Sequence, residues 1–154
     1  MLLKTSIRLE SPSPRERGFS LIELMIVLAI IAIIAAIAYP SYEKSVMRSD
    51  RSDATSALNQ DAQVLERCYT QYFAYNNATC VTAAASLAGP TQNGFYTVAI
   101  APLDATTYVI TATAIPGTRQ GSDTDCQKFT LDNTGTKVSY TASLATSSTE
   151  CWGG

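Results

Sequence analysis

The sequence predicts an α+β fold in which one long, kinked N-terminal helix packs on a four-stranded antiparallel sheet. Two observations predict the helix: an apolar span over residues 19–39, and an amphipathic pattern that continues beyond Pro40 to about residue 74. A third predicts the sheet, because residues 95–141 hold four short segments of alternating β-branched and aromatic side chains. A chain of 154 residues is long enough for one such core.

The apolar span is long enough to cross a membrane. Its 21 residues, Phe19 to Tyr39, include a single charged residue, Glu23. As a helix they would extend roughly 31 Å, about the hydrocarbon thickness of a bilayer. A leader of residues 1–18 precedes the span and carries Lys4, Arg8, Arg15 and Arg17. Because positive charge holds a leader in the cytoplasm, we expect the chain after the span to be exported.

The recognisable cleavage point lies before the apolar span. A secretory signal peptide is cut after its apolar region, which is then lost. Here the break falls at Gly18–Phe19, so cleavage would keep the apolar helix and leave a free α-amino group on Phe19. The sequence therefore predicts that the mature protein uses this helix.

This junction resembles the class III signal of type IV pilins, whose prepilin peptidase cuts after a glycine and methylates the new first residue. The resemblance covers residues 17–42. Four residues match the family at its spacing. Gly18 matches the cleavage glycine, Phe19 the methylated residue, Glu23 the assembly carboxylate and Pro40 the proline of the kink. It implies the type IV pilin fold, and a pairing of Glu23 with the α-amino group of an adjacent subunit.

The alternative is an ordinary membrane anchor, in which Glu23 would only complement the helix dipole. In an ordinary anchor, a carboxylate about one turn inside the hydrocarbon would cost free energy that no interaction offsets. Intramembrane carboxylates usually have a designated partner. Together with the Gly18–Phe19 junction, this favours a filament subunit.

Beyond Pro40 the predicted helix changes character. Proline lacks an amide donor and its ring crowds the preceding turn, so we expect a bend there. Apolar residues then recur at steps of three and four, as a stripe that should pack under the sheet: Ala54, Leu58, Ala62, Leu65, Tyr69 and Tyr72. Polar residues mostly lie off this stripe: Lys44, Arg48, Arg51, Asp53, Gln60 and Arg67.

Residues 75–94 lose periodicity and are interpreted as a connecting loop, within which Asn77-Ala78-Thr79 is loop composition rather than a glycosylation site. The four predicted strands follow it: 95–101, 107–115, 126–131 and 137–141. A tight turn at 132–135 joins the last two.

The four cysteines are even in number and lie on the exported side, which predicts two disulfides. Three connectivities are possible. Loop closure favours neighbours, Cys68 with Cys80 and Cys126 with Cys151. The second pair resembles the C-terminal disulfide loop of type IVa pilins, whereas the first departs from many pilins. Zinc is disfavoured, because no CxxC pair and no histidine are present.

Composition argues against catalysis, cofactors and metals. The net charge is −2, and loss of the leader, with four basic and two acidic side chains, makes it −4. No global basic field therefore attracts nucleic acid. The absence of histidine removes the commonest general base. A small basic cluster of Lys44, Arg48 and Arg51 is diluted by Asp50 and Asp53, which favours contact with lipid or a neighbouring subunit over DNA.

The sequence thus predicts a structural subunit of a type IV pilus, most like the PilE-type minor pilins of type IVa pili. The resemblance implies an inner-membrane precursor with a periplasmic head, other pilins, the prepilin peptidase and the inner-membrane assembly machinery as partners, and motility, adhesion or DNA uptake as properties of the pilus. One alternative is a pilin that itself binds DNA or a surface. Another is a type II secretion pseudopilin, which the two predicted disulfides disfavour.

Overall fold

The structure is a computed structural model that describes residues 18–147 and 149–153. The chain divides between Tyr39 and Pro40 into two compact units, an N-terminal segment and a head, residues 40–154. Of the predicted leader, residues 1–18, all but Gly18 lie outside the described residues.

The longest helix, α1, spans Leu21–Tyr72 and includes Pro40 without interruption. Every residue from 21 to 39 is exposed. Among the described residues α1 is the one helix long and apolar enough to cross a membrane. The bend at Pro40 stays a prediction. The helix ends where Phe73 adopts a left-handed conformation with φ of 54° and donates its N–H to the Tyr69 carbonyl.

The head contains an antiparallel sheet whose strands lie in chain order from β1 to β6. The four predicted strands are present as β2 (Tyr96–Leu103), β3 (Tyr108–Ala114), β4 (Lys128–Asp132) and β5 (Lys137–Tyr140). Two edge strands of two residues each were not predicted, β1 (Gly89–Pro90) and β6 (Thr146–Ser147). They are too short to show an alternating pattern. Two 3₁₀ turns, η1 (Gln120–Ser122) and η2 (Thr149–Trp152), complete the head.

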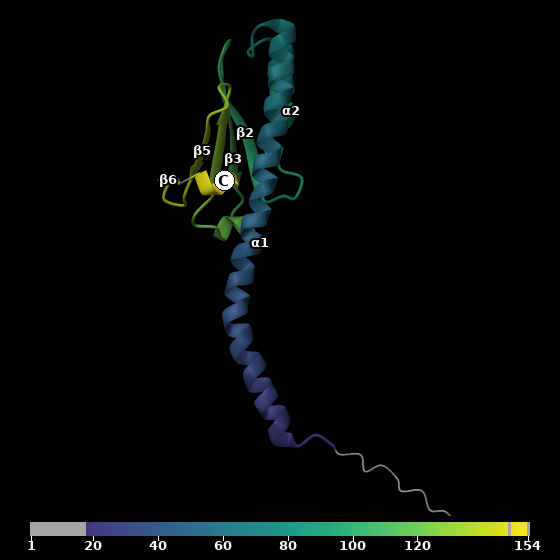
Figure 1. The fold of residues 1–154 in the computed structure, drawn as a ribbon. Coiled ribbons are helices and arrows are strands. Elements are labelled where there is room, and N and C mark those ends of the chain that lie inside the picture. The colour runs from purple at the N-terminus through teal and green to yellow at the C-terminus, as the bar shows by residue number, and fades with distance from the viewer. Residues whose placement is uncertain (1–17, 148, 154) are drawn as a thin grey trace, which may run out of the picture. The chain divides into compact units, whose positions relative to one another are not determined.

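One face of the sheet packs against the part of α1 that belongs to the head, residues 40–72. This part of the helix runs along the sheet in Figure 1. The inward side chains alternate along each strand, as in β3, where Tyr108, Ile110 and Ala112 are buried. They meet Ala54, Leu58 and Leu65 of α1. Three members of the predicted helix stripe are therefore fully buried, whereas Tyr72 at its end is 42% exposed.

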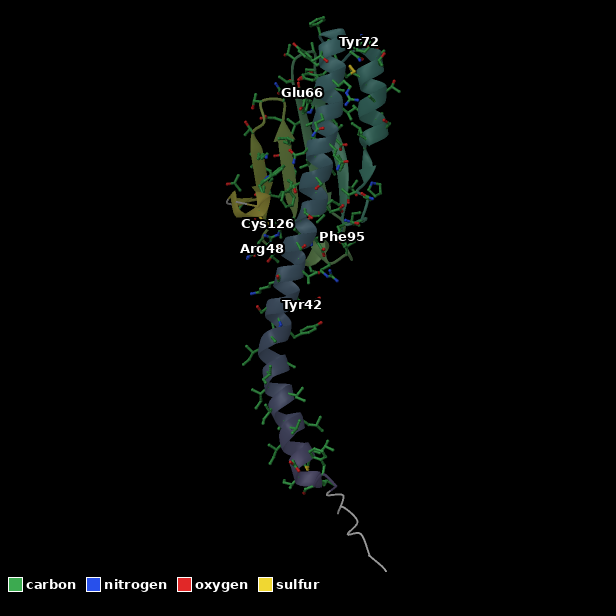
Figure 2. All side chains as sticks on the ribbon, turned by 45° about the vertical axis from the view of Figure 1, so that its right-hand side comes forward. Tyr42, Arg48, Glu66, Tyr72, Phe95 and Cys126 are labelled. Carbon is green, nitrogen blue, oxygen red and sulfur yellow. A yellow bond between two sulfur atoms is a disulfide. The ribbon has the colours of Figure 1, made fainter. Side chains whose placement is uncertain are left out.

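The predicted connecting loop was wrong over most of its length. Residues Ala78–Leu87 form a second helix, α2, which lies beside α1 in Figure 2. The Asn77 side chain caps it by accepting a hydrogen bond from the Thr79 N–H. The alanine-rich composition that looked irregular favours a helix, and the buried face needs only Cys80 and Ala84, one turn apart.

Candidate functional site

The predicted cleavage junction lies just outside α1. Residues 18–20 precede the first helical turn, and the Phe19 side chain is 82% exposed. The Ser20 carbonyl accepts hydrogen bonds from the N–H groups of Glu23 and Leu24, at 3.1 and 3.2 Å, which starts the helix. A Cβ atom built on Gly18 would meet no atom within 4 Å. Any need for glycine at this position therefore comes from a partner and not from the chain's own packing.

Glu23 lies in the first turn of α1, and its side chain is exposed. Within the described residues Glu23 forms no ion pair. A carboxylate on an otherwise apolar helix can accept hydrogen bonds from a cation that another molecule supplies. This is the arrangement that the predicted pairing with an α-amino group needs.

The cysteines form two disulfides. Cys68 at the end of α1 is joined to Cys80 of α2, and Cys126 is joined to Cys151. This is the pairing that loop closure favours, with 12 and 25 positions between partners. The first ties α2 to α1, and the second ties the chain end to the segment before β4.

Hydrogen bonds join the segment between β3 and β4 to the part of α1 where the head begins. Gln120 donates from Nε2 to the Met47 carbonyl at 2.9 Å, and its Oε1 accepts from the Tyr96 hydroxyl at 2.9 Å. Arg51 binds Asp123 through two hydrogen bonds of 2.7 and 3.0 Å. Burial is the main cause that raises the pKa of Tyr96, so its hydroxyl stays a donor at neutral pH.

A groove of about 430 Å³ lies between this part of α1 and the C-terminal segment. Its α1 side presents Arg48, Arg51, Ser52 and Thr55, and its other side presents Cys151, Trp152 and Gly153. Figure 2 labels Arg48, which lines the groove, and Cys126, whose disulfide partner Cys151 also lines it. Arg48 is exposed, and no hydrogen bond or ion pair joins its guanidinium to the residues described. The groove thus offers a cation and hydroxyl groups to an anion.

Trp152 is held rigidly at the edge of this groove. Its indole Nε1 donates to the Val138 carbonyl at 3.2 Å, and its ring meets Phe129 edge to face with centroids 5.7 Å apart. The Lys137 ammonium lies 5.3 Å from the Trp152 ring centroid. Lys137 therefore lies over the Trp152 ring, and Arg48 and Arg51 line the same groove as that ring, although Asp123 neutralises part of the charge of Arg51.

Two of the polar residues that lie off the apolar stripe are nevertheless little exposed. Asp53 is 8% exposed and accepts hydrogen bonds from the Thr91 hydroxyl and from Asn93 Nδ2. The Arg51 side chain is 13% exposed, because Asp123 covers it. Neutral side chains donate hydrogen bonds to Asp53, whereas the opposite charge of Asp123 pairs with Arg51, and all of these partners are remote in sequence.

A carboxylate with two phenol partners lies farther along α1. Glu66 Oε1 accepts from the hydroxyls of Tyr75 and Tyr108, at 2.8 and 3.0 Å. Burial, and next the hydrogen bond to Glu66, raise the pKa of both tyrosines, so they remain neutral donors. The Tyr75 ring also stacks on Tyr69. This cluster explains Tyr69 of the stripe as packing.

Comparisons with known proteins agree with this architecture. The family model described as type IV minor pilin ComP, DNA uptake sequence receptor, matches residues 40–130, more than half of the chain. The model of the prokaryotic N-terminal methylation motif matches residues 13–39. No curated protein matches the chain.

Among solved structures, the crystal structure of the Neisseria meningitidis non-core minor pilin PilV is similar, with a TM-score of 0.53 and 21% sequence identity. The similarity covers 67% of this chain and 95% of the PilV chain. At that identity it supports the pilin fold and nothing finer.

Proposed function

Because this chain belongs to the family of type IV minor pilins, whose members are structural subunits of the pilus, we propose that Phe19 and Glu23 direct its assembly. The chain is a membrane-anchored pilin that later joins the filament. In the proposed route, the precursor lies in the inner membrane with its N-terminus cytoplasmic and its head periplasmic. The prepilin peptidase cuts between Gly18 and Phe19 and methylates Phe19, and the inner-membrane assembly machinery then extracts the subunit.

The observation that carries this proposal is the exposed carboxylate of Glu23 on a helix whose residues 21–39 are all exposed. In the filament the charged amine of a neighbouring subunit's Phe19 would compensate that carboxylate. An unpaired charge in a low-dielectric helix bundle costs several kcal/mol. The pair would therefore select subunits in the correct register.

The test compares Glu23→Ala and the isosteric Glu23→Gln with the unchanged chain, in the membrane fraction and in sheared pili. Removing the carboxylate lowers the cost of the helix in lipid, by at most about 3 kcal/mol if Glu23 were central in the bilayer. Both variants should therefore be inserted and cleaved, and both should be depleted from pili. Undiminished amounts in pili would show that Glu23 only complements the helix dipole.

A second candidate function is DNA binding by the head. The matched family is described as a DNA uptake sequence receptor, and the groove beside Trp152 combines basic side chains with a fixed aromatic ring. Arginine and lysine side chains bind the phosphates of DNA. Because the net charge of the head is negative, the attraction of DNA phosphates is confined to the groove. Motility and adhesion are proposed as properties of the whole pilus.

DNA binding is tested with the purified full chain in detergent and a short duplex at increasing salt. Each phosphate contact that is lost reduces the slope of log affinity against log salt by about 0.9. Arg48→Gln should lower both affinity and slope. Arg67→Gln is the matched control, because Arg67 is also exposed on α1 but lies outside this groove. Equal effects of the two variants would reject the groove as the DNA site.

A further inference from the structure

Asp61 of the head lies on a face of α1 where the neighbouring side chains are apolar. It lies three residues after Leu58 and four before Leu65, both fully buried, and is itself 8% exposed. Spacing of three and four places all three side chains on one helix face. An aspartate at such a position costs free energy unless a partner compensates its charge.

No such partner is present in the part of the chain that the structure describes. Neither a hydrogen bond nor an ion pair joins the Asp61 carboxylate to any other described residue. Asp53, two turns earlier on α1, shows the contrast, because Thr91 and Asn93 satisfy its carboxylate. Burial correspondingly raises the pKa of Asp61 from 3.8 to about 6, so the group is still largely ionised at neutral pH.

The Asp61 carboxylate opens onto a cleft of about 180 Å³ between α1 and the chain around β1. Among the described residues, no side-chain nitrogen or oxygen that is sealed from solvent lacks a hydrogen bond. The partnerless oxygens of Asp61 must therefore reach the cleft. Its walls are apolar where Ala57, Leu87 and Val98 line it, and Gln60 and Gln92 add amide groups.

Size and charge limit what can fill this cleft. At roughly 30 Å³ for each water in the liquid, the space equals about six waters, well below the ~300 Å³ of a small-molecule pocket. The ionisable groups among its lining residues are Asp53 and Asp61, and none of the described lining residues is basic. A long side chain with an apolar stem and a cationic head fits such a site.

We propose that the Asp61 cleft receives the side chain of one lysine from a neighbouring subunit of the pilus. The ammonium has three donors, and the cleft offers the Asp61 carboxylate and the amide oxygens of Gln60 and Gln92. The lysine stem lies against Ala57 and Val98. The head thereby gains an intersubunit contact that is independent of the Glu23 pairing in the helix bundle, although it rests on incorporation of the chain into pili.

The first experiment measures Asp61→Asn in the membrane fraction and in sheared pili. We expect normal insertion and cleavage, and about tenfold less protein in pili, the factor for one lost charge-assisted hydrogen bond. Asp104→Asn is the matched control, since Asp104 is an exposed aspartate in the loop between β2 and β3. An Asp61→Asn level in pili equal to that of the control overturns the proposal, provided that the unchanged chain is present there. If the unchanged chain were absent from pili, its role as a subunit would be in question instead.

The second experiment treats intact pili with a water-soluble carbodiimide, which joins a carboxylate to an amine in contact with it. Peptide mapping should find the Asp61 peptide linked to a lysine peptide of another subunit, and this link should disappear in Asp61→Asn. An Asp61 peptide that remains unlinked in pili contradicts the proposal. So does protection of Asp61 by calcium in the isolated full chain, because it would assign the cleft to a metal ion.

Discussion

Arg51 on α1 donates hydrogen bonds from Nε and Nη2 to the two carboxylate oxygens of Asp123, a residue 72 positions away. Asp123 Oδ1 also accepts from the backbone N–H of Cys126, at 3.3 Å. One buried ion pair thus joins the head helix to the first cysteine of the C-terminal disulfide. It also fixes the arginine that lines the groove beside Trp152.

Replacing Arg51 by methionine should destabilise the head by about 3 to 5 kcal/mol, because Asp123 would remain as a buried charge without its partner. Chemical unfolding of the purified full chain measures the change. Arg119→Met is the matched control: Arg119 pairs with Asp50, but its side chain is 52% exposed, so its loss should cost less than about 1 kcal/mol. Similar losses in both variants would contradict the special role of the buried pair.

Asp61 should make the head less stable as the pH rises. The pKa is about 6 in the folded chain and 3.8 when unperturbed, so between these values the folded state binds more protons than the unfolded state. The free energy of unfolding therefore falls as the pH increases from about 4 to 6, by at most about 3 kcal/mol.

Asp61→Asn should remove this part of the pH dependence and raise stability at pH 7.5. Unfolding curves of both proteins at several pH values provide the measurement. A pH profile that the substitution leaves unchanged would show that the buried carboxylate is not the titrating group.

Cys126→Ser should loosen the C-terminal segment. The disulfide closes a loop of 25 positions, which restricts the unfolded chain and stabilises the head by about 3 kcal/mol. We expect this loss in unfolding experiments and faster proteolysis after β5. Peptide mapping without reduction provides the control on connectivity, and a link between Cys68 and Cys126 would disprove the pairing.

Processing should leave Phe19 as the first residue, with a methylated amine, because the charged leader cannot enter a filament core. Intact mass measurement of pili-derived protein decides this. A mature form that retains Arg17 and Gly18, or one cut after Tyr39, would contradict the assignment.

Gly18→Leu should block that cleavage, since the peptidase must accept the junction in an extended form that a side chain obstructs. The structure leaves room for a Cβ at Gly18, so the precursor should still fold and insert. Accumulation of full-length precursor in the membrane is the expected result. Normal cleavage of this variant would show that the peptidase tolerates a side chain there.

Local sequence patterns alone were enough to predict the long helix, the four main strands and the family. The apolar span and the Gly18–Phe19 junction need no tertiary contact to be recognised, and alternation marks β2 to β5 because one face of each is buried. The same reasoning missed α2, because an alanine-rich helix with two buried residues has little periodicity. It also missed β1 and β6, whose two residues each are too few to alternate.

The sequence by itself determined where the long apolar helix begins and which family the chain belongs to, because those properties depend on residues adjacent in the chain. Only the tertiary structure decided which polar residues are buried and what they meet. Asp53, Asp61 and Asp123 look alike in sequence, yet the first accepts from Thr91 and Asn93 and the third binds Arg51. Asp61 alone of the three lacks a partner among the described residues. Burial and pairing arise from segments that are remote in sequence, and no local pattern encodes them.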